Sequence, residues 1–379
     1  MKRYVSQQPI TFAAVGDIML DHEVSKLIAR RGPDFPFLNV ANELKDVDIV
    51  FGNLETPLTT CQKNVIWDFS KYGWAGRSKL IFLKGSPMAA IGLKNTGFNV
   101  VSIANNHILD YGIKGLRDTL TVLHKNGILP VGFGRNTRDA TAPKLLEVKG
   151  VRFAFFACSW AYEATFFSPG VAPIRSRMLK KQVKRAREIS DIVVVSLHLG
   201  IEFDESRSVA TIRLTRSLIE SGADIVLCHH PHVLQKIEIY KKGLIAYSLG
   251  NFVFDYRAFL KNTTEENAEK SRQSIILKCT MSKQGLIGYS IIPIHLNSEF
   301  QPTVVPRNSK LSQKIIAKVN AHQPVHRSSF NRKELKHTLK EITAIFNGLA
   351  VNLRRKKDFK SLYIFFEKTL DRIYSGNLF

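Results

Sequence analysis

Residues 224–235 read Asp-Ile-Val-Leu-Cys-His-His-Pro-His-Val-Leu-Gln and join an apolar run to a cluster of histidines. The run Asp224–Leu227 is short, aliphatic and followed by a proline-containing turn, which predicts a buried strand. In open α/β sheets, ligands bind beyond the carboxyl ends of the strands. Because His229, His230 and His232 stand at such an end, this segment predicts a polar site at one edge of a sheet.

The same arrangement recurs at four other apolar runs upstream. Taken singly, a carboxylate after a strand is usually a cap or turn residue, and an isolated histidine is usually structural. Five strand ends of this kind, holding five of the eleven histidines, favour a shared site instead. The four runs are Ile10–Val15, Asp48–Phe51, Phe98–Ile103 and Ile192–Leu197. The polar residues that follow them are Asp17, then Asn53 and Glu55, then Asn105, Asn106, His107 and Asp110, and then His198.

Strand-like and helix-like segments alternate over the first 230 residues, which predicts a largely parallel sheet covered by helices. A β-rich stretch from Val233 to Ile294 follows, with Lys241-Lys242-Gly243 as the turn of a hairpin. We expect one α/β domain over residues 8–300. Other predicted strands are 128–131, 151–157, 244–248 and 274–281, and the predicted helices are 23–30, 88–95, 113–126, 179–189 and 211–221.

The residue types at these strand ends suit divalent metals. Imidazoles and carboxylates bind Mn²⁺, Fe²⁺ or Zn²⁺, whereas the four cysteines form no CxxC pair and predict no thiolate zinc site. Two cations held by a shared carboxylate and by separate ligands polarise a phosphoryl oxygen and acidify a water molecule. We therefore expect two bound metal ions and hydrolysis of an ester without a covalent protein nucleophile.

Six motifs in order over residues 10–255 resemble the calcineurin-like metallophosphoesterase superfamily, and specifically its CapA branch of poly-γ-glutamate capsule synthesis proteins. The resemblance implies that superfamily's layered α/β fold, with helices packed on the sheets. The motifs are Gly16-Asp17-Ile18-Met19-Leu20, Asn53-Leu54-Glu55-Thr56-Pro57-Leu58, Asn105-Asn106-His107-Ile108-Leu109-Asp110-Tyr111-Gly112, His198-Leu199-Gly200-Ile201-Glu202, His229-His230-Pro231-His232-Val233-Leu234-Gln235 and Tyr247-Ser248-Leu249-Gly250-Asn251-Phe252.

The resemblance also implies roles for single residues. His107 matches the histidine that contacts the scissile phosphate and protonates the leaving group. Glu55 falls where a bridging aspartate is expected, with Asn53 as the competing candidate. The implied metal ligands are Asp17, Glu55, Asn106, His198, His230 and His232, with one imidazole of the closing His-x-His pair for each metal.

Some positions leave alternatives open or depart from the family pattern. Asp110 either caps the helix near Ile113 or orients His107 as a second catalytic residue. Asn251 either closes a turn or supports a metal ligand. The first motif has Met19 where the superfamily has a histidine, which puts one metal site in question.

The net charge of +23 favours acidic partners. Residues 306–379 contain 16 Lys+Arg and 5 Asp+Glu, and their apolar residues recur at helical spacing around Arg354-Arg355-Lys356-Lys357. We predict a basic helical appendage that packs on the main domain or docks to an anionic membrane or polymer. The sequence shows no signal peptide and no membrane span, so we expect a cytoplasmic protein, peripheral to the membrane at most.

Three functions are compatible with these features. The first is a two-metal hydrolase of capsule or poly-γ-glutamate biosynthesis, acting on a phosphoester or an anionic polymer. The second is a non-catalytic, polymer-binding subunit of anionic-polymer synthesis or export, within a membrane complex. Nucleic-acid processing ranks last, because no nucleic-acid-binding module accompanies the charge.

Overall fold

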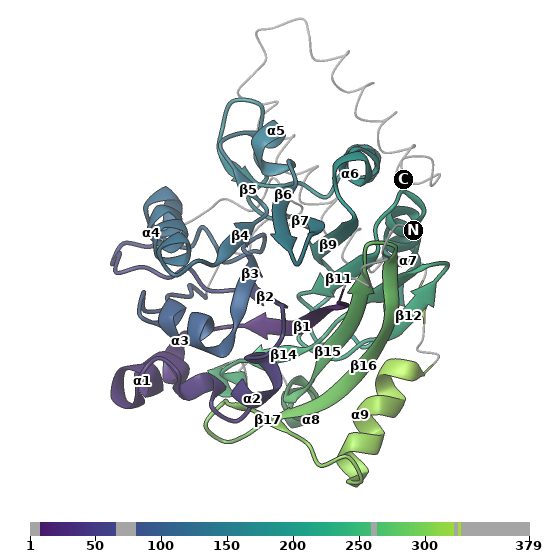
Figure 1. Cartoon of the computed structure of the whole chain (residues 1–379). Helices are drawn as coiled ribbons and strands as arrows, with labels where there is room; N and C mark the ends of the chain where they lie inside the picture. Colours follow the sequence, from purple (N-terminus) through teal and green to yellow (C-terminus); the bar gives the residue numbers. More distant parts are fainter. Residues whose placement is uncertain (1–7, 66–80, 259–263, 322–324, 327–379) are drawn as a thin grey trace, which may run out of the picture. The chain divides into compact units, whose positions relative to one another are not determined.

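The computed structural model describes residues 8–65, 81–258, 264–321 and 325–326 (Figure 1). Its sheets and helices belong to one compact unit that ends at His326. The predicted basic helices and the run Arg354–Lys357 lie outside the described residues. None of the described helices combines the length and the hydropathy that a bilayer crossing requires.

The first sheet has the strand order β17-β16-β15-β1-β2-β3-β4, and β14 pairs with β1. Strands β1 to β4 and β14 run parallel, whereas β15, β16 and β17 add antiparallel neighbours on the other side of β1. Its strands are β1 Ile10–Ile18, β2 Ile49–Leu54, β3 Phe98–Ser102, β4 Leu129–Val131, β14 Asn251–Val253, β15 Gln273–Ser282, β16 Gly285–Leu296 and β17 Pro302–Val304.

The second sheet has the order β12-β13-β11-β9-β7-β6. Its four central strands are parallel, and the edge strands β6 and β12 are antiparallel to their neighbours. The strands are β6 Lys144–Val148, β7 Val151–Ser159, β9 Ile192–His198, β11 Ile225–His229, β12 Ile237–Tyr240 and β13 Gly243–Ala246. Two small pairs lie outside these sheets, β5 Phe133–Gly134 with β8 Gly170–Val171 and β10 Arg207–Ser208 with β18 Val325–His326.

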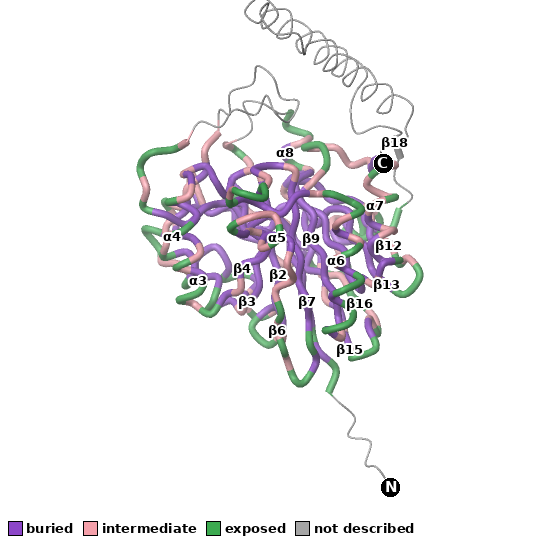
Figure 2. The backbone as a smooth tube through the Cα atoms, turned by 90° about the horizontal axis from the view of Figure 1, so that it is seen from above, coloured by how far each residue is buried: buried purple, intermediate pink, exposed green. Residues whose placement is uncertain are grey.

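The two sheets face each other through apolar side chains. Phe51 of β2 stacks on Phe155 of β7, with ring centroids 6.2 Å apart and planes inclined by 6°. The central strands are buried along nearly their whole length, as Figure 2 shows. Such continuous burial is typical of strands covered on both faces, and it explains why their sequences are uniformly apolar.

Helices cover the outer faces of both sheets. α3 and α4 lie on β3 and β4, and α6 and α7 pack on the second sheet through Leu179, Val183 and Leu218. α9 packs on β16 and β12 and belongs to the same compact unit. The helices are α1 His22–Arg31, η1 Phe35–Phe37, α2 Ala41–Leu44, α3 Ala89–Thr96, α4 Gly112–Lys125, α5 Thr137–Ala140, α6 Ser176–Ile189, α7 Val209–Glu220, α8 Glu265–Ser271 and α9 Lys310–Asn320.

The predicted layered α/β fold class is confirmed, and the predicted strands and helices correspond closely to observed ones. The hairpin at Lys241 is present, with β12 and β13 joined in the register Tyr240↔Gly243. The prediction of one largely parallel sheet differs from the structure, which has two mixed sheets. Apolar runs identify strands, but they do not determine which strands become neighbours.

Candidate metal centre

Asp17 lies near the end of β1, where Gly16 lets β1 approach β14 closely. A Cβ on Gly16 would lie 1.9 Å from the carbonyl oxygen of Gly250, so no larger residue fits there. The Asp17 amide donates to this same oxygen at 3.0 Å. Asp17 is paired in register with Asn251, which brings the first and last motifs side by side.

The carboxylates of the first two motifs point into one buried space. Asn53, in register with Asp17 on β2, donates its amide N–H to Asp17 Oδ1 at 2.8 Å. Glu55 Oε1 lies 3.5 Å from His198 Nε2 and 3.9 Å from His232 Nε2. The Asn53 amide therefore orients Asp17, while the Glu55 carboxylate faces the imidazoles.

The histidines come from the second sheet. His198 and His229 are register partners at the ends of β9 and β11. His230 and His232 follow with φ angles of 99° and 58°, a left-handed conformation that is rare for residues other than glycine. Strain of this kind costs on the order of 1–3 kcal/mol per residue and is concentrated at functional sites. Here it turns the imidazoles toward the carboxylates, and the rings of His198 and His230 are 4.8 Å apart.

His107 is held by a network that follows β3. Asn105 Oδ1 accepts from the His107 amide at 3.1 Å, and Asn105 Nδ2 donates to the Leu54 carbonyl at 2.9 Å, which ties this loop to β2. Asp110 Oδ2 lies 2.8 Å from His107 Nδ1. The N-cap of α4 is Tyr111, with no side-chain cap bond. Of the two roles left open for Asp110, the structure therefore favours orienting His107 over capping the helix.

Asn106 and Asn251 each contact a histidine of the cluster. Asn106 Oδ1 lies 2.9 Å from His198 Nε2. Asn251 Oδ1 lies 2.9 Å from His232 Nδ1, whose other neighbour is Asp17 Oδ2 at 3.2 Å. Asn251 thus holds the His232 ring in place. This agrees with the interpretation in which Asn251 supports a predicted metal ligand.

Burial and charge act in opposite directions on the titration of this centre. Burial acts to raise the pKa of Asp17, but its contacts with His229 and His232 lower it well below the usual range. Burial lowers the pKa of His230 to about 4. For His232, burial also acts to lower the pKa, but the charges of Glu55 and Asp17 raise it to about 10. Asp17 and Glu55 thus stabilise positive charge at the position of His232.

Two groups of side chains have the composition and spacing of a metal site. In each group, the three potential ligand atoms lie within 4.8 Å of one another and belong to buried residues. Nitrogen and carboxylate oxygen donors of this kind fit borderline divalent cations. Glu55 is common to both groups. The groups are Glu55 with His230 and His232, and Asp17 with Glu55 and His198.

This grouping differs from one detail of the ligand set that the resemblance implied. His230 and His232 fall in the same group, whereas the resemblance implied one imidazole for each metal. Asn106 stays a predicted ligand, because the two groups comprise only histidine and carboxylate side chains, and its oxygen adjoins His198. Met19, at the position of the missing histidine, packs in an apolar cluster with Leu83 and Phe254 and so offers no ligand there.

Two contributors had no assigned role in the sequence analysis. His229 was not among the ligands that the resemblance implied, yet its Nδ1 lies 3.3 Å from Asp17 Oδ1. Asn105 bridges the β2 and β3 ends through the hydrogen bonds described above. An asparagine directly after a strand is a turn signal, so the pattern indicated its location but not its partners.

Residues 11–256 match the family model described as "Bacterial capsule synthesis protein PGA_cap". The chain is 32% identical over 302 residues to the capsule biosynthesis protein CapA of Bacillus anthracis, which covers 78% of this chain and 69% of that protein. It is 33% identical over 316 residues to the PGA biosynthesis protein CapA of Bacillus subtilis (strain 168), and this match covers 82% of this chain and 77% of that protein.

Solved structures resemble the chain more distantly. A phosphatase from Mycoplasma pneumoniae aligns at 14% identity and a TM-score of 0.46, over 76% of this chain and 94% of that one. A 5'-nucleotidase from Candida albicans SC5314 aligns at 11% identity and a TM-score of 0.40, over 88% of this chain and 57% of that one. Likeness at these scores does not bear on function.

Proposed function

The chain belongs to the bacterial capsule synthesis family PGA_cap, and we propose that it is a metal-dependent hydrolase in the synthesis of an anionic capsule polymer. The observation that carries this proposal is the sharing of Glu55 by two overlapping groups of buried ligands. A carboxylate common to two sites is what a pair of closely spaced cations requires. The relatives are named for the biosynthesis of a capsule and of PGA. Together with the resemblance to metallophosphoesterases, this leads us to propose poly-γ-glutamate, or a phosphoester formed on the way to the capsule, as the substrate class.

In this proposal, Asp17, Glu55, His198, His230 and His232 hold two divalent cations, Mn, Fe or Zn, with Asn106 beside His198. When bound, such cations polarise a phosphoryl oxygen and make water a nucleophile near neutral pH. The side chains that hold them are buried, and they are oriented by Asn53 and Asn251. Ligands fixed in this way need little reorganisation when substrate binds.

His107 is proposed as the general acid. Its Nδ1 is engaged by Asp110 Oδ2 at 2.8 Å, so in this proposal Nε2 is the nitrogen that carries the proton for the leaving group. Asp110 is itself held by the Leu83 amide at 2.8 Å. A buried carboxylate that orients an imidazole in this way also stabilises its protonated form. The His107 side chain is 10% exposed, whereas that of Asp110 is fully buried.

The setting of the reaction is part of the same proposal. We place the protein in the cytoplasm or at the inner membrane surface, in a capsule-synthesis membrane complex. The basic region after residue 326 would contact anionic lipid there.

The packing of Met19 favours a second candidate function. Because this side chain faces Leu83 and Phe254, one metal site lacks the ligand that the superfamily has at that position. A protein with one weak site would serve as a non-catalytic, polymer-binding subunit of capsule synthesis or export. That version predicts polymer binding without turnover.

The test is elemental analysis of protein purified without chelator, followed by assays of phosphoesters and of poly-γ-glutamate. We expect about two metals per chain in the wild type, depletion of metal in His230→Ala, and metal-dependent turnover that His107→Ala lowers by about 10²–10⁴-fold. His124→Ala, on the exposed face of α4, is the matched control and should change neither the metal content nor the turnover. Absence of metal after incubation with excess Mn²⁺ would overturn the hydrolase proposal. Bound metal without turnover on either substrate class would favour the accessory role.

A further inference from the structure

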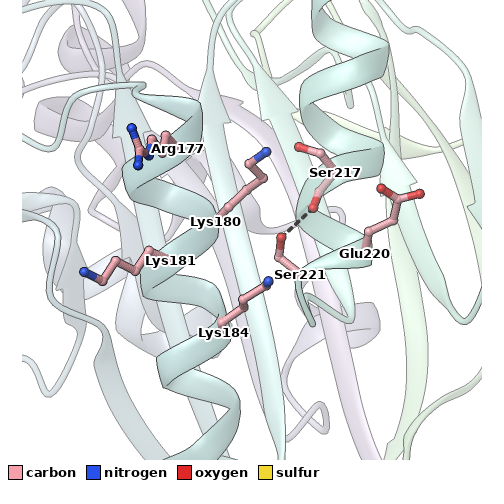
Figure 3. A pocket seen from close by; sticks show the side chains of 7 residues that line it. All are labelled: Arg177, Lys180, Lys181, Lys184, Ser217, Glu220 and Ser221. Carbon is pink, nitrogen blue, oxygen red and sulfur yellow. Dashed lines mark hydrogen bonds between the residues drawn. The ribbon is translucent and has the colours of Figure 1, made fainter. Parts of the chain in front are cut away.

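A groove of about 450 Å³ lies between α6 and α7, on the outer side of the second sheet (Figure 3). The two helices bury their apolar faces against the sheet, including Leu179 and Val183 of α6. Their solvent-facing sides form the groove, and Lys180 and Lys184 extend from α6 toward α7. The lining residues are Arg177, Lys180, Lys181, Lys184, Ser217, Glu220 and Ser221.

Positive charge exceeds negative charge in this groove, although the charge of Lys180 acts on Glu220. None of its four cations makes an ion pair with another described residue, whereas Arg187 at the end of the same helix pairs with Asp224 at 2.7 Å. Glu220 is the one carboxylate in the lining, and its Oε1 already accepts from Lys241 Nζ and from the Tyr240 hydroxyl, both at 2.8 Å. The groove therefore presents four cations to one carboxylate that has partners of its own.

The spacing of the four cations does not serve the stability of α6. Residues three and four positions apart on a helix are neighbours, and like charges at these spacings repel each other. Arg177, Lys180, Lys181 and Lys184 are related by such spacings, so they form a continuous stripe that disfavours the isolated helix. Buried Leu179, Val183 and Ala186 hold α6 on the sheet. The four like charges destabilise the isolated helix, and a bound anionic ligand that neutralises them would account for their presence.

The stripe begins at the edge of the sheet that carries the metal centre. Pro173 is bridged to Ser159, the last residue of β7, and Ser159 is in register with His198 on β9. α6 begins three residues after Pro173, at Ser176, so Arg177 lies at this edge. Lys184 follows about 10 Å further along the helix axis, at 1.5 Å per residue. A chain lying in the groove would thus extend toward the metal centre.

We propose that the α6–α7 groove binds a stretch of a polycarboxylate chain, with successive carboxylates on Arg177, Lys180, Lys181 and Lys184. The choice of a polycarboxylate rests on the proposed function, and the stripe supplies the complementary charge. A flexible polymer with one negative charge per repeating unit can place several of them along such a stripe without a precisely shaped pocket. The groove is a docking surface, and the hydrolytic chemistry remains at the metal centre.

The test measures binding of a short fluorescent poly-γ-glutamate to the full chain by anisotropy at several salt concentrations. In the triple variant Lys180→Gln, Lys181→Gln, Lys184→Gln we expect the Kd to rise by about tenfold or more and its salt dependence to weaken. The matched control removes three exposed lysines elsewhere, Lys94→Gln, Lys125→Gln and Lys283→Gln, and should change the Kd less than about twofold. The charge-preserving variant Lys180→Arg, Lys181→Arg, Lys184→Arg should bind as the wild type does.

Three results would overturn the proposal. The first is an equal loss of polymer affinity in the groove variant and the control variant. The second is unchanged polymer binding in a groove variant that is folded. The third is binding of double-stranded DNA as tight as that of the polymer, if the groove variant loses it too. Thermal melting of each variant checks folding. Asp17→Asn separates this proposal from the proposed function, because it should lose metal and turnover but retain polymer binding. Conversely, the groove variant should retain metal and turnover of a small phosphoester.

Discussion

The metal centre and the α6–α7 groove carry charge in opposite ways. At the metal centre the carboxylates and imidazoles are buried, and each is fixed by neighbours from other strands, as Asp17 is by Asn53 and His232 by Asn251. In the groove, Lys181 and Lys184 are exposed and Lys180 is partly exposed, and all of them come from a single helix. The charged groups of the metal centre are positioned by tertiary contacts, whereas the cations of the groove are spaced by the local sequence of one helix and exposed to water.

This difference determines how each region should respond to substitution. In a buried polar network, removal of one member leaves its partners unsatisfied, so single changes have large effects. Exposed charges interact weakly one at a time because water and salt screen them. The following predictions test this contrast, from the largest expected effect to the smallest.

His107→Ala should lower kcat by about 10²–10⁴-fold while the metal content stays unchanged, because a general acid contributes to the chemical step and not to metal binding. Steady-state kinetics on a phosphoester and elemental analysis of the same sample measure both quantities. His124→Ala is the control for histidine removal. A kcat within twofold of wild type would show that His107 is not the proton donor.

Asp17→Asn should weaken metal binding by about 100-fold or more, because it removes a negative charge that lies within 3.3 Å of both His229 and His232. Metal titration monitored by calorimetry measures the affinity. Asp46→Asn, at an exposed position, is the isosteric control. Equal affinities in the wild type and in Asp17→Asn would remove Asp17 from the site.

Gly16→Ala should reduce the free energy of unfolding by about 3 kcal/mol, because the new Cβ would meet backbone and not a movable side chain. Gly288→Ala is the matched control, since a Cβ there has no heavy atom within 4 Å and should change stability by less than about 0.5 kcal/mol. Urea unfolding of both variants checks the difference. Similar losses in the two would mean that the β1–β14 approach is not tightly constrained.

Arg187→Gln should cost about 1–2 kcal/mol at neutral pH, because Asp224 is buried and loses its ion-pair partner. Burial raises the pKa of Asp224, and Arg187 offsets only part of that shift. A carboxyl with a raised folded-state pKa contributes stability that is complete below its unfolded-state pKa, about 3.9. That stability is lost as the pH rises through the folded-state value.

The cost of Arg187→Gln should therefore shrink as the pH falls toward the unfolded-state pKa of Asp224. Thermal or urea unfolding over a pH series measures it. A cost that is independent of pH would show that Asp224 is not its origin.

Lys184→Gln, one turn before Arg187, should change the stability by less than about 0.5 kcal/mol at any pH, because this lysine has no ion-pair partner among the described residues. The same unfolding series measures it. A loss as large as that of Arg187→Gln would contradict the distinction between paired and unpaired cations on α6.

The sequence indicated most of the strands and the residues at their ends. Asp17, Glu55, His198 and His230 were recognised because each follows an apolar run, and the structure brings them within reach of one another. The role of Asp110 remained open between two interpretations, because an aspartate before a helix fits a cap as well as a histidine partner. Its 2.8 Å contact with His107 forms within one turn, but the same Asp110 oxygen also accepts from the Leu83 amide, which is distant in sequence.

Strand periodicity, turn residues and motif order were determined by the sequence alone, because they depend on interactions between residues close together along the chain. The family could be inferred for the same reason, from motifs that keep their order. The tertiary structure decided the division into two mixed sheets, the pairing of β14 with β1 and the place of Glu55 in both ligand groups. It also decided that the cations of α6 form a groove with α7. These features join residues far apart in sequence, and only the packing of the sheets and helices sets the distances between them.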